Sequence, residues 1–203
     1  PLYSSAASDV YKRQVEKDCG QYDTVTEVMW VTGAALFIRL ADYREVGGLD
    51  GHFFAHMEEI DLCWRLRSRG KKLVCIPQSV VYHVGGATLK KENPRKTFLN
   101  FRNNLLMLYK NLPDKELEHV LFIRGILDRV AALVFYLKKD RANARAVMQA
   151  RREFEDIRYS FAASRIENMM KSTDEIIPER THFSIVMKYY LLGKKHFSQL
   201  KLF

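Results

Sequence analysis

Three carboxylates lie close together at the start of a short segment that is predicted to be helical. The segment His56–Gly70 reads HMEEIDLCWRLRSRG and contains Glu58, Glu59 and Asp61. Because an α-helix turns roughly 100° per residue, Glu59 is expected to share a face with the apolar residues Leu62, Cys63 and Leu66. A carboxylate that points inward at a helix start has either a structural partner or a chemical function.

The other two carboxylates are predicted to lie away from the centre of this face. Glu58 falls at its edge, and Asp61 lies beyond it. Ile60, Trp64 and Arg67 are predicted on the opposite side, which makes the helix amphipathic. Helix capping alone also explains the three carboxylates, because the unpaired amides and the macrodipole of a first turn favour negative charge. The three carboxylates alone do not distinguish helix capping from a catalytic role, so the rest of the chain has to be considered.

The composition indicates a globular protein of a reducing compartment. The chain has 203 residues, 47% of them hydrophobic, which is enough for one core with appendages. Its three cysteines form no Cys-X-X-Cys pair, so neither a disulfide framework nor a zinc site is indicated. No apolar run approaches the roughly 20 residues that span a bilayer, and no secretory signal pattern is present. We therefore expect a soluble or peripheral protein of the cytoplasm.

The positive charge is confined to the second part of the chain. Residues 1–83 contain 10 Lys and Arg against 11 Asp and Glu, a net charge of −1. Residues 84–203 contain 23 against 13, a net charge of +10. This imbalance predicts an anionic partner for the second part, such as a nucleic acid, a phosphorylated substrate or an acidic membrane surface.

The part before residue 94 is predicted to be an α/β layer. Its short apolar runs are predicted strands, at 28–31, 34–39, 73–76 and 80–83. The order strand, helix, strand is typical of α/β layers. The last strand ends at His83, where α/β sheets commonly carry ligand chemistry, although a histidine at a strand end is also often structural.

The chain is predicted to divide into three parts. Residues 1–14 are expected to be an artefactual or disordered tail, because Asp9–Gln14 resembles a translated sequencing adaptor. Residues 15–93 form the α/β part. Residues 94–203 are predicted to be a basic helical extension, with helices at 94–111, 115–138 and 141–163 and a loop at 167–181.

The last stretch of the chain combines aromatic, aliphatic and basic residues. Phe183–Phe203 includes Tyr189 and Tyr190 together with Lys188, Lys194 and Lys195. This composition is typical of an interfacial helix, and equally of a helix docked on its own domain.

Several short motifs of the α/β part resemble glycosyltransferase family 2 in their order and spacing. They are WVTGAALFIR at 30–39, VGGLD at 46–50, FF at 53–54, EEIDL at 58–62 and VYH at 81–83. The similarity is to rhamnosyltransferase-like bacterial members and covers residues 28–112. It implies the acceptor half of a GT-A (Rossmann-like) domain, followed by an α-helical carboxy-terminal extension similar to that of some Bacteroidetes members.

The resemblance assigns expected roles to individual residues. Such enzymes use a nucleotide-sugar donor and a divalent metal, and they invert the anomeric carbon; their donor half, with an Asp-X-Asp motif, has no match here. The base position falls on Glu59. Since the family usually has Asp there, Glu58 and Asp61 remain alternative bases.

Four further residues match family positions outside this motif. His83 matches a residue that helps to hold the metal, either Mg²⁺ or Mn²⁺. Trp30, Gly33 and Asp50 match residues that line or shape the acceptor side. A buried tryptophan and a turn glycine, however, need no such role.

The resemblance implies a fragment of an inverting hexosyltransferase of cell-surface polysaccharide synthesis. It would act on a glycan or lipid-linked acceptor at the inner face of the cell membrane, and the fragment alone would be inactive. The alternative is a non-enzymatic, basic peripheral module that binds membranes or nucleic acid. Against nucleic acid, no helix-turn-helix, zinc or aromatic-platform signature accompanies the charge.

Overall fold

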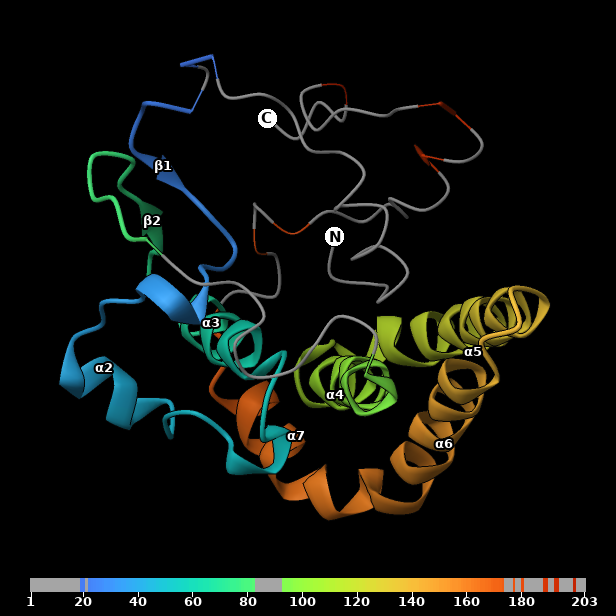
Figure 1. The fold of residues 1–203 in the computed structure, drawn as a ribbon. Helices are drawn as coiled ribbons and strands as arrows, with labels where there is room; N and C mark the ends of the chain where they lie inside the picture. Colours follow the sequence, from blue (N-terminus) through green and yellow to red (C-terminus); the bar gives the residue numbers. More distant parts are fainter. Residues whose placement is uncertain are drawn as a thin grey trace.

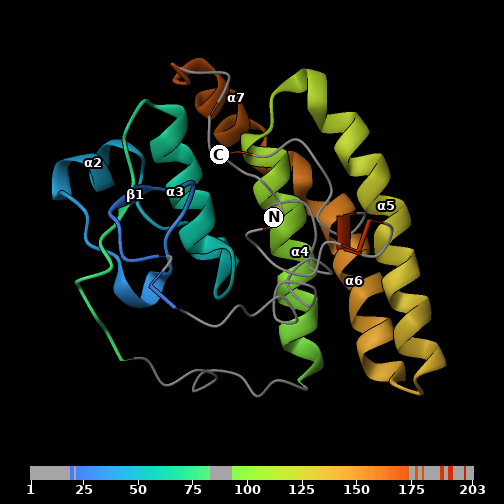
Figure 2. The same cartoon turned by 90° about the horizontal axis from the view of Figure 1, so that it is seen from above.

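The computed structural model describes residues 19–20, 22–82 and 93–173, and seven further residues beyond them: 177, 180, 188–189, 192–193 and 199. Figure 1 shows the small sheet and helix α2 (Leu40–Glu45) on one side of the molecule and helices α5 (Asp114–Leu137) and α6 (Arg141–Ile157) on the other. The view in Figure 2 shows the same separation, with α3 (Glu58–Ser68) and α4 (Pro94–Asn111) between them. The predicted tail at 1–14, His83 and most of 183–203 lie outside the described residues.

The sheet is much smaller than the sequence predicts. Strand β1 (Thr26–Glu27) pairs antiparallel with β2 (Val74–Cys75), and Thr26 lies opposite Cys75. The predicted strands at 28–31 and 34–39 and the described part of 80–83 are wrong, because these residues form no ladder. Val28 donates a backbone hydrogen bond to Leu73 at 2.9 Å, next to the β1–β2 pair. The apolar side chains of 28–31 otherwise pack against α3, so their pattern reflects burial more than sheet pairing.

The segment after Trp30 turns instead of extending. Residues Gly33–Ala35 form a 3-10 turn, η1, whose first backbone amides are capped by the Thr32 side chain, 3.4 Å from the Ala34 nitrogen. The described fold is therefore mostly helical with a two-stranded sheet. It is compatible with part of an α/β glycosyltransferase domain.

Helix α3 is buried on both sides. The prediction that it is amphipathic is therefore wrong. Every residue from Ile60 to Arg69 is buried. Leu62, Cys63 and Leu66 pack with Val46 and Leu73 in one apolar cluster. The opposite side packs Ile60 and Trp64 against α4 in a second cluster. A helix enclosed in this way must find partners inside the protein for its charged side chains.

The helices after residue 93 agree closely with the sequence prediction. Asn93 caps α4 by accepting a hydrogen bond from the Arg95 nitrogen at 2.9 Å, with Pro94 in the first turn, and Asp140 caps α6 in the same way. The helix predicted at 141–163 is interrupted by a 3-10 turn, η3 (Arg158–Phe161), before α7 (Ala162–Met170). Helix α7 therefore occupies the start of the predicted loop at 167–181. No helix of the described residues is long and apolar enough to cross a membrane.

The hydrophobic core continues across the predicted boundary at residue 94. Phe53, Ile60 and Trp64 from before the boundary belong to one cluster with Leu105 and Leu108 of α4. All five are less than 10% exposed. Helix α4 thus packs as part of the same core as α3, and the described residues do not separate into two cores there.

A buried network of charges joins α3 to α4. Asp61 accepts hydrogen bonds from Arg65 at 2.8 and 3.0 Å, from Lys110 Nζ at 3.0 Å and from Asn111 at 2.8 Å. Lys110 also lies 2.8 Å from Asp50, and Arg65 donates to the carbonyl of Gly48 at 2.7 Å. The network therefore holds the end of α2 and the loop after it against both helices.

We expect Lys110→Met to lower the free energy of unfolding by about 3–5 kcal/mol, because Asp50 and the buried Asp61 are then left with Arg65 as the one Lys or Arg of the network. Urea unfolding followed by helical circular dichroism measures the change. Lys72→Met is the matched control, since Lys72 is paired with Glu27 at an exposed position and its removal should leave stability nearly unchanged. Equal effects of the two substitutions would contradict the structural role of Lys110.

Candidate active site

The loop that leads into α3 has an unusual backbone. Phe54, His56 and Met57 have φ angles of 61°, 70° and 76°, in the left-handed region that non-glycine residues rarely occupy. Each such residue costs roughly 1 kcal/mol or more, so the surrounding structure must enforce the conformation. Strained backbone of this kind is frequent at functional sites, and here it directly precedes the candidate base.

One side chain of α4 holds this loop. The side-chain amide nitrogen of Asn103 lies 2.8 Å from each of the carbonyl oxygens of Phe53, Ala55 and His56. Asn103 is fully buried. Because a single group bonds to three successive parts of the loop, the start of α3 is positioned by α4.

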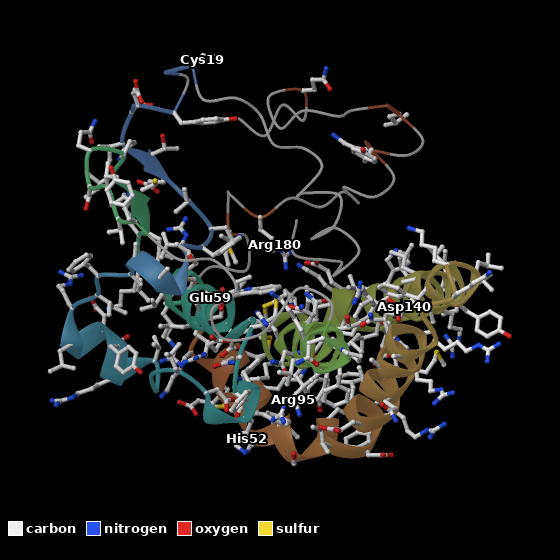
Figure 3. All side chains as sticks on the ribbon, in the orientation of Figure 1. Cys19, His52, Glu59, Arg95, Asp140 and Arg180 are labelled. Atoms are coloured by element: carbon white, nitrogen blue, oxygen red, sulfur yellow. The ribbon has the colours of Figure 1, made fainter. Side chains whose placement is uncertain are left out.

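Glu59 lies in the first turn of α3 and is partly buried (Figure 3). Burial raises the pKa of its carboxyl group, the negative charge of Glu58 raises it further, and backbone amides at the helix start oppose the shift. Its Oε2 atom is buried and has no hydrogen-bond partner in the structure. A carboxylate with a raised pKa and an oxygen free to accept a bond suits a general base.

Glu58 is the second carboxylate of the turn. It is also partly buried, and its Oε2 atom likewise has no hydrogen-bond partner. The two glutamates are neighbours in the first turn, and the negative charge of Glu58 disfavours ionisation of Glu59. The structure shows the same kind of free oxygen on both, so Glu58 remains an alternative to Glu59.

Asp61 has a different environment from the two glutamates. It is completely buried, and both of its oxygens accept hydrogen bonds from Arg65, Lys110 or Asn111. A carboxylate enclosed by two cations and an amide has no free oxygen to receive a proton from an acceptor hydroxyl. This geometry supports a structural role for Asp61.

The three predicted acceptor-side residues lie around the same helix. A Cβ atom placed on Gly33 would lie 3.5 Å from Cβ of Glu59, so η1 passes directly beside the candidate base. Trp30 is partly buried and packs against the apolar clusters on both sides of α3. Asp50 accepts bonds from Lys110 and from His52 Nδ1 at 2.7 Å, and these partners lower its pKa to about 2 against the opposing effect of burial.

The described residues do not form a metal centre by themselves. Within residues 22–82 and 93–173, no three His, Cys, Asp or Glu side chains converge closely enough to hold a metal ion. Glu58 and Glu59 would supply two oxygen donors, the type that Mg²⁺ and Mn²⁺ prefer, but two are not a complete set. His83 lies outside the described residues.

Sequence reasoning missed the polar residues of α4 that build the site. Asn103, Lys110 and Asn111 bond to residues about 50 positions earlier, a distance that helix periodicity cannot bridge. A signal was present, because these polar side chains interrupt the buried face around Leu105–Leu108. A polar residue on the apolar face of a helix requires a buried partner.

Comparison with known proteins identifies a class of similar enzymes. The chain is similar over part of its length to proteins named as glycosyltransferases, two of them rhamnosyltransferases. No family model matches the chain, and no solved structure matches it.

Three relatives illustrate the extent of the similarity. The chain is 32% identical over 74 residues to the rhamnosyltransferase WbbL of Escherichia coli K12, covering 36% of the chain and 27% of that protein. It is 31% identical over 141 residues to the pre-mycofactocin glycosyltransferase of Mycobacterium tuberculosis, covering 64% of the chain and 29% of that protein. It is 38% identical over 56 residues to the N-acetylglucosaminyl-diphospho-decaprenol L-rhamnosyltransferase of the same species, covering 28% of the chain and 18% of that protein. The chain therefore spans less than a third of the length of these relatives.

We expect Glu59 to titrate above the ordinary range of a glutamate, while Glu167, which Lys171 stabilises in its charged form, titrates below it. Carboxyl ¹³C chemical shifts followed against pH measure both. Equal midpoints for the two residues would contradict the desolvated environment of Glu59.

The same shift predicts a pH dependence of stability. A carboxyl group whose pKa is raised by folding stabilises the protein below its unfolded pKa, and this contribution is lost as the pH rises through the folded pKa. The free energy of unfolding of the wild type, relative to Glu59→Gln, should therefore fall across that window. Urea unfolding of both proteins at several pH values measures it.

Proposed function

We propose that this chain is the acceptor-side part of an inverting glycosyltransferase in which Glu59 is the general base. The observation that carries the proposal is the partly buried Glu59 carboxyl group, with its raised pKa and unpartnered Oε2, at the end of a strained loop. The similarity to proteins named as glycosyltransferases supports the reaction class. The donor is proposed to be a nucleotide-sugar and the acceptor a glycan or a lipid-linked sugar.

The proposed chemistry is a single displacement. A hydroxyl group is a poor nucleophile near neutral pH, so Glu59 takes its proton while the hydroxyl oxygen bonds to the anomeric carbon of the donor. The bond from that carbon to the nucleoside diphosphate breaks on the opposite face, which inverts the configuration. The fixed loop and the close approach of Gly33 orient the carboxyl group for this step.

The three acceptor-side residues are proposed to have distinct tasks. Trp30 would form part of the wall of the acceptor site, and Gly33 would keep the space beside Glu59 open, since a larger residue would contact its side chain. Asp50, which stays ionised through Lys110, would orient an acceptor hydroxyl. Asp61 is assigned to the support of α3.

A divalent metal, Mg²⁺ or Mn²⁺, is proposed as the cofactor of the longer protein. Such an ion would neutralise the charge that develops on the departing diphosphate. His83 is the residue of this chain proposed to contact it. Sugar transfer to a lipid-linked acceptor would place the enzyme at the inner face of the cell membrane.

In a longer protein that carries this segment, Glu59→Gln should lower the rate of sugar transfer by about 10²–10⁴-fold, the usual contribution of a positioned base. In the wild type, the rate should fall as the pH drops through the raised pKa of Glu59, because only the ionised carboxylate accepts a proton. Transfer measured with radiolabelled nucleotide-sugars at several pH values tests both statements.

Two control substitutions separate chemistry from folding. Glu58→Gln should reduce transfer much less than Glu59→Gln, and a reversed order would assign the base to Glu58. Asp61→Asn should lower the free energy of unfolding, whereas Glu59→Gln should not. Near wild-type transfer by both glutamate variants would contradict the proposed function.

His83→Ala should raise the metal concentration required for half-maximal transfer, because one ligand of the ion is lost. A titration of activity with MnCl₂ and with MgCl₂ measures the change. An unchanged titration curve would contradict the proposed contact between His83 and the metal ion and would indicate a structural role for His83.

A further inference from the structure

Helix α5 presents a long apolar face outward. Five large hydrophobic side chains recur at helical spacing along it, at Phe122, Ile126, Val130, Leu133 and Leu137. They are between 50% and 71% exposed. With a rise of about 1.5 Å per residue, the stripe extends over roughly 22 Å. Isolated exposed apolar residues are ordinary, but a contiguous stripe of this length indicates an interaction surface.

The stripe is not the face by which α5 packs within the protein. The buried residues of α5 lie on its other side and include Leu117, Leu121 and Ala132. Figures 1 and 2 both show α5 and α6 at the side of the molecule farthest from the sheet. The stripe is therefore remote from Glu59 and the acceptor site.

Exposed cations lie on the same two helices as the stripe and on the turn between them. Between residues 119 and 152, six Lys and Arg side chains are exposed, at positions Arg129, Lys138, Lys139, Arg141, Arg145 and Arg152. The same range contains only two acidic residues. Asp128 is buried between Arg124 and Arg151, and Asp140 caps α6 through Asn143. The exposed charge between residues 119 and 152 is thus positive, while the exposed acidic residues of the two helices lie at their far ends, at Asp114, Glu118, Glu155 and Asp156.

A surface hollow lies where the two helices meet. It is lined by Tyr136, Leu137, Lys139 and Arg141. The guanidinium of Arg141 stands 5.8 Å from the centre of the Tyr136 ring. An aromatic ring with two cations beside an apolar stripe is the arrangement expected at the boundary between lipid headgroups and acyl chains.

We propose that the α5–α6 hairpin binds the surface of an anionic membrane, with the stripe inserted among acyl chains and the six cations near lipid phosphates. A second copy of the chain is disfavoured as the occupant, since it would bring two sets of cations together. The proposal extends the proposed function by naming the surface that brings the site to a lipid-linked acceptor. The proposed function explains why the protein would bind a membrane, and in that respect this proposal rests on it. Vesicle binding itself can be measured without sugar transfer.

Co-sedimentation of the 203-residue chain with vesicles tests the proposal. Vesicles of phosphatidylcholine containing phosphatidylglycerol should bind the chain at low salt, and binding should weaken at high salt, as for charges near a surface. Vesicles of phosphatidylcholine alone should bind it much less. Equal binding to both kinds of vesicle, or binding to neither, would overturn the proposal.

Two double variants assign the binding to this surface. Val130→Asn with Leu133→Gln should lower the partition coefficient about tenfold or more, because two apolar side chains no longer leave water. Arg141→Gln with Arg145→Gln should lower it on anionic vesicles and reduce its dependence on salt. All four positions are exposed, so circular dichroism should show unchanged helix content.

Matched controls lie elsewhere on the molecule. Ile166→Gln on α7 removes an apolar side chain that is 58% exposed, and Arg39→Gln with Arg44→Gln removes two exposed cations near α2. These variants should bind vesicles as the wild type does. Losses equal to those of the hairpin variants would overturn the assignment.

Two further outcomes are distinguishable. A dimer in analytical ultracentrifugation that the Val130→Asn and Leu133→Gln variant dissociates, without vesicle binding, would assign the stripe to contacts between copies and overturn the proposal. Glu59→Gln should bind vesicles normally, so loss of transfer and loss of membrane binding report on the two proposals separately.

Discussion

The buried carboxylate of Asp61 is the interaction on which the arrangement of the described core depends. Helix α3 is enclosed by apolar clusters on both sides, so Asp61 and Arg65 are withdrawn from water. Arg65 and Lys110 neutralise Asp61 inside the protein and at the same time bind the loop that follows α2. Packing of α4 against α3 is therefore fixed in register by charge as well as by apolar contact.

Two carboxylates separated by one residue acquire opposite properties from this arrangement. Asp61 is surrounded by donors and is committed to holding helices together, whereas Glu59 is desolvated without a full set of donors and has a raised pKa. The strained loop held by Asn103 sets the start of α3, and hence the position of Glu59. Helix α4 therefore belongs to the proposed active site, although it contributes no group to the proposed proton transfer.

The helical hairpin on the far side of α4 has a different character from the site. Its inner faces complete the packing of the helical part, α5 exposes an apolar stripe, and six exposed cations lie between residues 119 and 152. The net charge of +10 after residue 83 is thus partly gathered on one surface and not spread evenly. The proposed active site and the proposed membrane-binding surface lie on opposite sides of the molecule, so each can be altered by substitution without the other.

Local sequence determined the helices after residue 93, because caps such as Asn93 and Asp140 and the apolar periodicity act within a few residues. It also placed Glu59 at the start of a helix. The strands at 28–31 and 34–39 could not be predicted correctly, since an apolar run does not record whether a neighbouring strand is present. The different environments of Glu59 and Asp61 were likewise set only by tertiary structure. The environment of Asp61 depends on Lys110 and Asn111, about 50 residues away, and a buried ion pair arises only when folding brings such groups within hydrogen-bond distance.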